Sequence, residues 1–520
     1  MATAEPASKP KRGFPSSVTI LAFVTVLVWV AALLLPSGVY KLDAQGAPIP
    51  GTYHQVPSPL TFPQMVEQLV LAPINGLYGV RDTATGFIST GATGTLFGAV
   101  GVVVFLMAIG AFMSVCYATK SLEVAIGALA HRLRDRGSLL IAAIMVLFSA
   151  LGSLMGFSVE TLGFYALFIP LLAALGYDRL TTAAMIILGA LTGVMAATVN
   201  PFSIGVASGE AGVSIGDGIL LRLVLWPVLT GISVFFVLRY AKKSRKRPDE
   251  LATAVETSPS SAVSADPSAA PVAAPPETPG LTGTQRRVLA IMGLVFGLMV
   301  FSVIPWSSLF GGVAGPAEDL NEHVTSVAPF WFELNWWFPE LAMLFILSSV
   351  VVGVVAKMGE KDTIKLIGSG MADMINPAIV VLLAQGVAVV MTNTLTLGTL
   401  LHSMEQLVAG TSAGFFAVIT EVINVGLAML IPSSSGHAAL AMPLLAPLSD
   451  FAQVSRPLMI TAWICGHGLA LMFSPTSVVL IGGLSIAEVG YDKYLRFAWP
   501  LLLALFLVSA VVVAIAATLG

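Results

Sequence analysis

Four polar interruptions inside long apolar stretches are the places where this sequence could do chemistry. They read MGFSVETLG at residues 155–163, TVNPFS at 198–203, IPSSSGHAA at 431–439 and SPTS at 474–477. Non-helical backbone at membrane depth is tolerated only where it lines a cavity or is buried in protein. We therefore expect these four segments to surround a binding site.

The first interruption carries a carboxylate, Glu160, followed by Thr161. A glutamate inside a membrane hairpin is costly, so it should pair with a cation, a bound ion, a proton or an amine. The alternative is a glutamate at the water-exposed mouth of a hairpin. The functional interpretation makes Glu160 and Thr161 binding residues.

The second and fourth interruptions are predicted to be broken helices. A proline after Asn200 removes a helix hydrogen bond and frees a carbonyl, and Ser203 adds a hydroxyl. Such oxygens suit a small cation, whereas the N-terminus of the following helix suits an anion. The fourth interruption offers Ser474, Thr476 and Ser477, so a sodium ion could lie at either break, near Asn200 or near Thr476. A plain proline kink is the alternative.

The third interruption places Ser433, Ser434 and Ser435 just before His437. Three hydroxyls at a helix N-terminus can clamp an anion or a carboxylate. His437, in the first turn of this helix, is a further candidate binding residue.

Several polar residues within the apolar stretches have less certain roles. His467 could be a ligand or a proton carrier, or its ring could be satisfied by a neighbouring carbonyl. Asn424 is a further candidate ligand, although Asn424, Gln385 and Glu421 are expected mainly to stabilise helix contacts. No ATP-binding loop, metal-ligand spacing or nucleophile elbow occurs, so no enzyme and no cofactor beyond a sodium ion or a proton is expected.

Composition identifies the elements that must hold these residues. Of 520 residues, 56% are hydrophobic and only 10% are charged, and the mean hydropathy is +0.90. Soluble domains carry about 25% charged residues. A net charge of −3 excludes a nucleic-acid partner, and two cysteines exclude a disulfide scaffold. The chain is predicted to be an all-α polytopic membrane protein whose partners are the lipid bilayer and a small molecule.

Apolar runs predict about nine crossings and two hairpins, taken as re-entrant, although the hairpins could also span the membrane fully. The hairpins are Ser138–Tyr177 and Phe415–Leu448, each interrupted near its middle. A tract of Ala, Pro, Ser and Thr predicts a disordered cytoplasmic linker over 242–285, between an N-terminal tail (1–17) with a first repeat (18–241) and a second repeat (286–520). The nine crossings are Val18–Pro36, Leu96–Ala118, Thr181–Ser208, Gly218–Tyr240, Val288–Trp306, Trp337–Ala356, Ala372–Thr392, Pro457–Ser485 and Tyr494–Leu519.

Lysine and arginine placement predicts the orientation. All but four of the 25 Lys and Arg residues fall in segments that this topology puts on one side. The exceptions are Lys41, Arg81, Arg222 and Arg456. By the positive-inside rule the N-terminus is cytoplasmic and the C-terminus is outside, in the plasma (inner) membrane of a bacterium.

The two halves align with each other at an offset of about 273 residues, which predicts inverted repeats because the hairpins open from opposite sides. The extra span Trp337–Ala356 corresponds to the weaker stretch Phe62–Leu77, which is expected to be an interfacial helix. The matches are Pro170–Ala173 with Pro443–Ala446, Asn200–Ser203 with Ser474–Ser477, Trp226–Pro227 with Trp499–Pro500, and Gly163 with Gly436.

These motifs resemble the YfcC family, which is related to the DcuC-type C4-dicarboxylate carriers of the ion transporter superfamily. The resemblance covers 17–240 and 287–518, and it includes Pro36–Tyr40, Pro50–Val56, and Gly156 with Glu160-Thr161. It also includes Asn200–Phe202, Pro432-Ser433 with Gly436, and Pro475–Ser477. It implies a secondary transporter with a scaffold and a mobile transport domain, often a homodimer. It implies that hairpin tips and breaks hold substrate carboxylates and, in some members, sodium ions, here at Glu160, Thr161, Asn200, Ser433, Ser434, Ser435, Thr476 and Ser477.

The leading hypothesis is a secondary active transporter of a small carboxylate-bearing metabolite that works by alternating access. Glu160 favours an amino acid, through basic amino acid exchange or ion-coupled uptake, because the carboxylate can meet an amine while the serines hold the acid group. The alternative is a carrier of a C4-dicarboxylate or another organic anion, coupled to protons or sodium. In that case His437 and His467 would neutralise the anion at mildly acid pH. Two hairpins that close one site argue against a simple channel.

Overall fold

The computed structural model describes residues 17–41, 49, 51–82, 85–245, 280–310, 315–316, 326–327, 330–408 and 411–519. Residues 1–16 of the expected tail and 246–279 of the expected linker lie outside this description. The described ends of the linker are helical, because Lys242–Ser244 continue one helix and Gly283–Gln285 begin the next. The domain bounds themselves, including the linker, stay a prediction.

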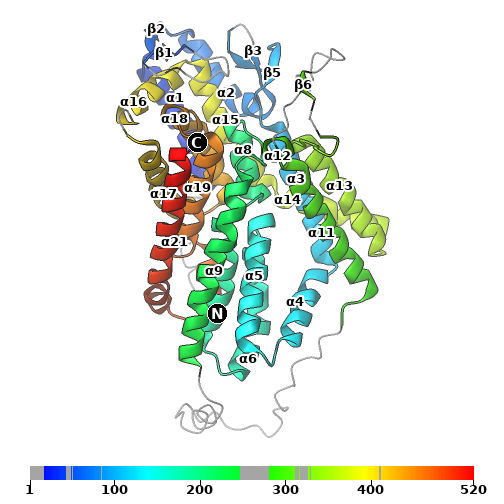
Figure 1. Cartoon of the computed structure of the whole chain (residues 1–520). Helices are drawn as coiled ribbons and strands as arrows, with labels where there is room; N and C mark the ends of the chain where they lie inside the picture. Colours follow the sequence, from blue (N-terminus) through cyan, green and yellow to red (C-terminus); the bar gives the residue numbers. More distant parts are fainter. Residues whose placement is uncertain are drawn as a thin grey trace, which may run out of the picture.

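Helices dominate the described residues, and eight of their helical stretches are long and apolar enough to cross a membrane (Figure 1). These stretches are α3 (Val100–Ala118), α5 (Gly137–Met155), α9 (Ile219–Ser244), α11 (Gly283–Val303), α13 (Phe338–Val355), α14 with α15 (Glu360–Asp373, Ile375–Asn393), α17 (Ala413–Leu430) and α21 (Tyr491–Leu519). The others are α1 (Ser17–Leu34), α2 (Phe62–Tyr78), α4 (Ser121–Arg132), α6 (Tyr165–Ala174), α7 (Arg179–Met195), α8 (Val206–Ala211), α12 (Trp306–Phe310), α16 (Thr396–Val408), α18 (Ser434–Phe451), α19 (Arg456–Leu471) and α20 (Val478–Ile486).

The nine predicted crossings all correspond to helices. Two of them, α7–α8 and α19–α20, are split as the sequence predicts. The first split contains a π turn, η2 (Pro201–Gly205), in which the Gly205 amide donates to the Asn200 carbonyl at 3.0 Å. Single π turns inside helices frequently mark functional sites.

Short strands occur only in the described loops. They form an antiparallel pair, a three-stranded sheet in the order β4-β3-β5, and a second antiparallel pair. The strands are β1 (Ser37–Val39), β2 (His54–Val56), β3 (Val80–Asp82), β4 (Ile88–Ser89), β5 (Gly94–Leu96), β6 (Gly315–Pro316) and β7 (Ser326–Val327).

Glu405 on α16 fastens the β1–β2 loop to the helices. Its carboxylate accepts hydrogen bonds from the Tyr40 hydroxyl at 2.6 Å and the Gly51 amide at 2.7 Å, and it lies 3.3 Å from His402 Nδ1. Burial alone would raise the pKa of Glu405, but these bonds outweigh it and lower the pKa. The loop therefore depends on an ionised carboxylate.

The two halves run in opposite directions. In Figure 1, α9 descends toward the grey trace at the lower end, whereas α21 rises to the C-terminus. The ring of Phe497, near the start of α21, lies 5.1 Å from Phe236 and 4.6 Å from Tyr240, which are near the end of α9. Contact between the last turns of one helix and the first turns of the other requires antiparallel packing.

The two helix crossings inside the repeats are also equivalent. A Cβ added to Gly193 of α7 would lie 2.0 Å from the Ser149 carbonyl of α5. A Cβ added to Gly466 of α19 would lie 2.2 Å from the Glu421 carbonyl of α17. The glycines differ by 273 positions, the offset that the sequence repeat predicts, so each repeat uses one glycine for the same close approach.

The first hairpin, α5–η1–α6, is closed at its base, where Ser138 Oγ lies 3.4 Å from Tyr177 Oη. Its 3₁₀ segment η1 spans Val159–Phe164. The second hairpin, α17–α18, begins just after α16, and its last residue Phe451 lies 5.2 Å from Tyr40, which is bonded to α16. Each hairpin thus begins and ends at one end, and its first helix, α5 or α17, is long and apolar enough to cross a membrane. Whether the hairpins are re-entrant or fully spanning stays a prediction.

Helix α2, expected to be interfacial, packs along α15. Its Gly76 is so close to α15 that an added Cβ would lie 2.6 Å from the Gly386 amide nitrogen. Helices α3 and α14 approach each other in the same way, since a Cβ added to Gly110 of α3 would lie 2.4 Å from the Gly370 carbonyl oxygen of α14. We call α1, α2 and α15 the α15 bundle, because both α1 and α2 pack on α15.

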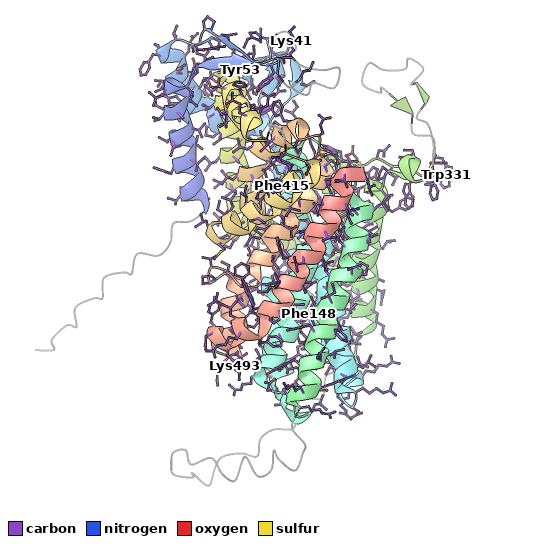
Figure 2. All side chains as sticks on the ribbon, turned by 60° about the vertical axis from the view of Figure 1, so that its left-hand side comes forward. Lys41, Tyr53, Phe148, Trp331, Phe415 and Lys493 are labelled. Carbon is purple, nitrogen blue, oxygen red and sulfur yellow. The ribbon has the colours of Figure 1, made fainter. Side chains whose placement is uncertain are left out.

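The outer surface suits a bilayer. Phe235, Leu294 and Val354 are 67%, 71% and 71% exposed, on three different spanning helices. Figure 2 shows Lys41 and Lys493 at opposite ends, with the exposed Phe415 at a level between them. Apolar side chains on the flanks and charged ones at the ends are typical of a membrane protein.

Candidate functional site

The four polar interruptions are joined by one closed series of contacts, which we call the contact ring. The Gly156 turn of the first hairpin packs against Asn200, since a Cβ there would lie 2.9 Å from Asn200 Oδ1. Ser434 Oγ of the second hairpin donates to the Phe202 carbonyl of the first break at 3.4 Å. The ring thus joins the two repeats.

The other half of the ring runs through the second break. Thr476 Oγ1 donates to the Met429 carbonyl, at the end of α17, at 2.9 Å. Helix α20 then packs on the first hairpin, where Gly482 faces Leu162 and Gly483 faces the Tyr165 hydroxyl. Each hairpin therefore rests on the broken helix of the opposite repeat.

The two breaks are built alike. Asn200 Oδ1 accepts the Phe202 amide at 3.0 Å, and Ser474 Oγ accepts the Thr476 amide at 3.3 Å. In both, a polar side chain before proline caps the backbone two residues later. Asn200, Ser203, Ser474 and Ser477 are buried, whereas Thr476 is exposed.

The second hairpin tip forms the predicted helix N-terminus. Ser433 caps α18 by accepting the Gly436 amide at 3.3 Å, and its hydroxyl lies 3.3 Å from that of Ser435. Ser435 is buried, while Ser433 and Ser434 are half-buried. The hydroxyls and the free amides of the first turn can hold a carboxylate.

Glu160 lies differently from the deeply paired carboxylate that the sequence suggested. It is exposed, and its Oε2 accepts the Ser158 amide of its own tip at 3.1 Å. Thr161 is buried and donates to the Ser158 carbonyl at 2.5 Å. Glu160 thus lies at the exposed tip of the first hairpin, where an arriving cation can reach its carboxylate.

His437 and His467 pair with each other, not with a carbonyl. Their Nδ1 atoms lie 2.9 Å apart, and Trp463 stacks on His467 at 5.7 Å. All three side chains are fully buried, and among the described residues neither Nε2 atom has a partner. One Nδ1 must donate and the other accept, so the two rings have different tautomers, and either ring can be the donor.

Asn424 and Glu421 serve helix contacts, at least in part. Asn424 Nδ2 donates to the Thr420 carbonyl of its own helix at 2.7 Å. The Glu421 carboxylate accepts the Ser509 hydroxyl of α21 at 2.5 Å. The Glu421 bond joins two helices, as expected for that residue, whereas the Asn424 bond stays within α17, and its role as a ligand stays a prediction.

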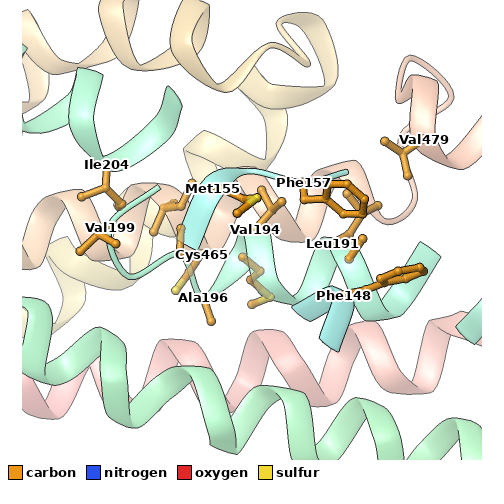
Figure 3. Packing of buried hydrophobic residues seen from close by; sticks show 14 of the residues in the cluster. Phe148, Met155, Phe157, Leu191, Val194, Ala196, Val199, Ile204, Cys465 and Val479 are labelled. Atoms are coloured by element: carbon orange, nitrogen blue, oxygen red, sulfur yellow. The ribbon is translucent and has the colours of Figure 1, made fainter. Parts of the chain in front are cut away.

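The first hairpin packs on buried apolar side chains. Figure 3 shows Met155 and Phe157 of the hairpin above Leu191 and Val194 of α7, with Cys465 from the other repeat nearby. These residues belong to the buried core. Such packing fixes the position of the tip.

Four functional candidates escaped the sequence reasoning: Ser153, Ser208, Glu210 and Trp463. Ser153 Oγ donates to the Ala196 carbonyl at 2.9 Å and so ties α5 to the first break. Glu210 of α8 accepts a hydrogen bond from Gln385 of α15. The expected crossing ended at Ser208, so Glu210 was left outside it. A carboxylate ten residues after the Asn200 break, in a half-helix, was the available signal.

The charge around the ring has one sign. Residues 180–221, 411–455 and 457–492 contain neither lysine nor arginine, and neither does the first hairpin. Among the described residues, no group of three or more His, Cys, Asp and Glu side chains could hold a metal ion. A cavity of about 440 Å³ lies away from the predicted residues, between Gly216–Leu221 and the first turns of α19.

Comparison with known proteins places these features among transporters. The sequence profile of the DcuC family, described as C4-dicarboxylate anaerobic carrier, matches residues 14–518. A protein of Escherichia coli named "Putative basic amino acid antiporter YfcC" is 28% identical, over 99% of this chain and 98% of its own. An uncharacterized protein of Haemophilus influenzae is 24% identical, over 99% of both chains.

Two solved transporters share the fold. The YdaH transporter of Alcanivorax borkumensis superposes with a TM-score of 0.66 over 96% of this chain and 98% of its own, at 15% identity. MtrF of Neisseria gonorrhoeae, described within a class of antimetabolite efflux pumps, gives a TM-score of 0.59 over 96% and 95% of the two chains, at 13% identity. The relatives and the fold are those of transporters, not of enzymes.

Proposed function

This chain belongs to the DcuC family, and from that premise we propose that it is a secondary active transporter of a small carboxylate-bearing metabolite, above all a basic amino acid. The contact ring carries the proposal. It joins hydroxyls and helix N-termini to an exposed carboxylate, in segments without lysine or arginine.

Each end of an amino acid has a matching group. The substrate carboxylate binds at the first turn of α18, where Ser433, Ser434 and Ser435 surround unpaired backbone amides. Thr476 and Ser477 offer a similar helix start at α20, where Ser477 caps Leu480. Glu160, exposed at the opposite tip, meets the substrate ammonium. The name of the E. coli relative supports this substrate class.

Transport proceeds by alternating access in this proposal. The hairpins and broken helices move as one body because each hairpin rests on the broken helix of the other repeat. Glu160 and Thr476 are exposed, whereas their neighbours Thr161, Ser474 and Ser477 are buried. A substrate would therefore first meet Glu160 and Thr476.

The second candidate is a C4-dicarboxylate carrier, favoured by the family description and by the buried pair His437–His467. A proton on that pair would offset one substrate charge. Sodium at the Asn200 or Thr476 break stays a prediction, as do a homodimer and an inner-membrane location with a cytoplasmic N-terminus.

Binding can be tested with purified protein by thermal shift against basic amino acids, other amino acids and C4-dicarboxylates, with and without sodium. Stabilisation by arginine or ornithine supports the proposal, and stabilisation by dicarboxylates alone favours the second candidate. Glu160→Gln and Ser434→Ala should then abolish uptake into vesicles while the protein remains folded.

Two matched controls isolate the site. Glu340→Gln changes another exposed glutamate whose carboxylate accepts a backbone amide, from Trp337 at 3.0 Å. Ser403→Ala removes another hydroxyl that donates to a carbonyl, that of Thr399 at 3.1 Å. Both controls should transport normally. Unchanged uptake by Glu160→Gln and Ser434→Ala would refute the site assignment.

A further inference from the structure

A second polar contact joins the moving body to the α15 bundle. Gln385 Nε2 of α15 donates to Glu210 Oε2 of α8 at 2.5 Å. The remaining Oε1 atoms of Glu210 and of Gln385 are both buried, and neither has a partner among the described residues. A carboxylate and an amide thus meet with one hydrogen bond formed and two oxygens unpaired.

Protonation of Glu210 would give each of the two unpaired oxygen atoms a hydrogen-bond partner. A neutral carboxylic acid has an O–H donor, and an amide has an acceptor oxygen beside its N–H. Glu210 Oε1–H can donate to Gln385 Oε1 while Gln385 Nε2–H donates to Glu210 Oε2. An ionised Glu210 leaves a buried charge and two unpaired acceptors, which is costly at this depth.

Within the part of the chain that the structure describes, Glu210 forms no ion pair with a lysine or arginine. Arg222 of α9 donates to the Ile215 and Asp217 carbonyls, and Arg456 of α19 donates to the Ala211 carbonyl at 2.9 Å. Its guanidinium is already bonded to Asp450 of α18 at 3.0 and 2.7 Å. Neutralisation by a proton is therefore the simplest outcome.

The other elements packed against α8 supply no competing charge. On α3 and α13, Val102 and Phe338 face Gly209 of α8. The remaining titratable groups on these elements are Cys116 and Tyr117 on α3, Glu340 on α13, His437 on α18, and Cys465 and His467 on α19. Glu340 is exposed at the start of its helix, and the two histidines bond each other.

The contact lies where the transport cycle must break it. Helix α8 follows the first break and packs on α18, so it belongs to the moving body. Gln385 is fixed on the other side, because the next residue, Gly386, packs against Ala72 of α2. Movement of the hairpins along the α15 bundle would separate Glu210 from Gln385.

We propose that Glu210 and Gln385 form a proton-binding site between α8 and α15, which holds one proton in this conformation and releases it when the two helices separate. The proton comes from water, takes Glu210 from a charge of −1 to neutral, and returns to water on release. The inference rests on the proposed transport function, since it names the coupling ion.

Infrared difference spectroscopy tests the site without a substrate. The wild-type protein at about neutral pH should show the carbonyl band of a protonated carboxylic acid that Glu210→Gln lacks. The swap Glu210→Gln/Gln385→Glu rebuilds the acid–amide pair in reverse and should regain a band. Absence of any band assigned to Glu210 would overturn the inference, as would stabilisation by sodium that Glu210→Gln abolishes.

Proteoliposomes with a trapped pH indicator test the coupling. Substrate flux through the wild type should carry protons, and a pH gradient should stimulate it severalfold. Glu210→Gln should reduce that stimulation to about onefold. Glu421→Gln is the control, because among the described residues the Glu421 carboxylate, like that of Glu210, has one hydrogen-bonded and one unpaired oxygen, and it should keep the stimulation. Transport without proton flux in the wild type refutes the inference, whereas failure to transport any compound of the panel refutes the proposed function.

Discussion

Replacement of Gly193 by alanine should damage both the stability and the transport activity of this protein. The new Cβ would lie 2.0 Å from the Ser149 carbonyl oxygen, and real Cβ atoms stay at least about 3 Å from such an atom. Helices α5 and α7 must then separate by about 1 Å. Neither atom can rotate away, because one is backbone and the other is fixed to it.

The cost can be bounded from similar changes. Overpacking a core by one methyl group typically costs about 1–3 kcal/mol, and a rigid backbone contact belongs at the upper end. The shift also reaches the functional region, since Ser153, one turn beyond Ser149, holds the first break through the Ala196 carbonyl. Transport should therefore fall by more than the folded fraction does.

Gly231→Ala on the neighbouring helix α9 is the matched control, because nothing lies within 4 Å of its added Cβ. It should be neutral or slightly stabilising, as glycine-to-alanine changes inside helices are. Gly466→Ala and its control Gly426→Ala repeat the comparison in the second half. Thermal unfolding in detergent, followed by gel filtration, measures all four. Equal stability of Gly193→Ala and Gly231→Ala would refute the close-approach argument.

Three further predictions follow from the contacts. His437→Leu and His467→Leu should each cost about 1–3 kcal/mol by leaving one Nδ1 unpaired, while the double variant should cost no more than either single one; additive losses in a double-mutant cycle would contradict the pairing. The lowered pKa of Glu405 means that its contribution is complete above its ordinary value of about 4.3 and is lost as pH falls through the lowered value. The protection of the β1–β2 loop against hydrogen exchange, corrected for the intrinsic exchange rate at each pH, should therefore fall below about pH 4 in the wild type and at all pH values in Glu405→Gln; wild-type protection that does not change with acid would contradict this. Asn200→Ala should cost about 0.5–2 kcal/mol, as a lost helix cap does, and stop uptake, whereas uptake at the wild-type rate would remove Asn200 from the site.

The architecture was predictable because helices that cross a membrane appear in the sequence as long apolar runs. Long apolar runs, short broken ones and a repeat at a fixed offset gave nine crossings and two hairpins, and each has a helix in the structure. Helices α4, α14 and α16 were missed, since they are amphipathic or polar and were taken for loops.

The site was predictable in outline only. Interruptions such as Pro432–Gly436 are visible in one dimension, but which interruption touches which is a property of the packed fold. The sequence made His437 and His467 separate candidates, whereas the fold brings their Nδ1 atoms within 2.9 Å of each other, a contact that the sequence does not show. Glu210 was overlooked because its significance comes from Gln385, 175 positions away on another helix.

Each hairpin packs on the broken helix of the opposite repeat, and this has a consequence for how the chain is synthesised and inserted. Tyr165 is inserted long before Gly483, the residue it packs against, has been synthesised. At about 5–20 residues per second, the intervening chain takes roughly 15–65 seconds to translate. During that time the first hairpin and its polar tip lie in the bilayer without α20, the helix on which they pack in the complete fold. The nascent first half is therefore the state in which a membrane insertase or chaperone would have the most to protect.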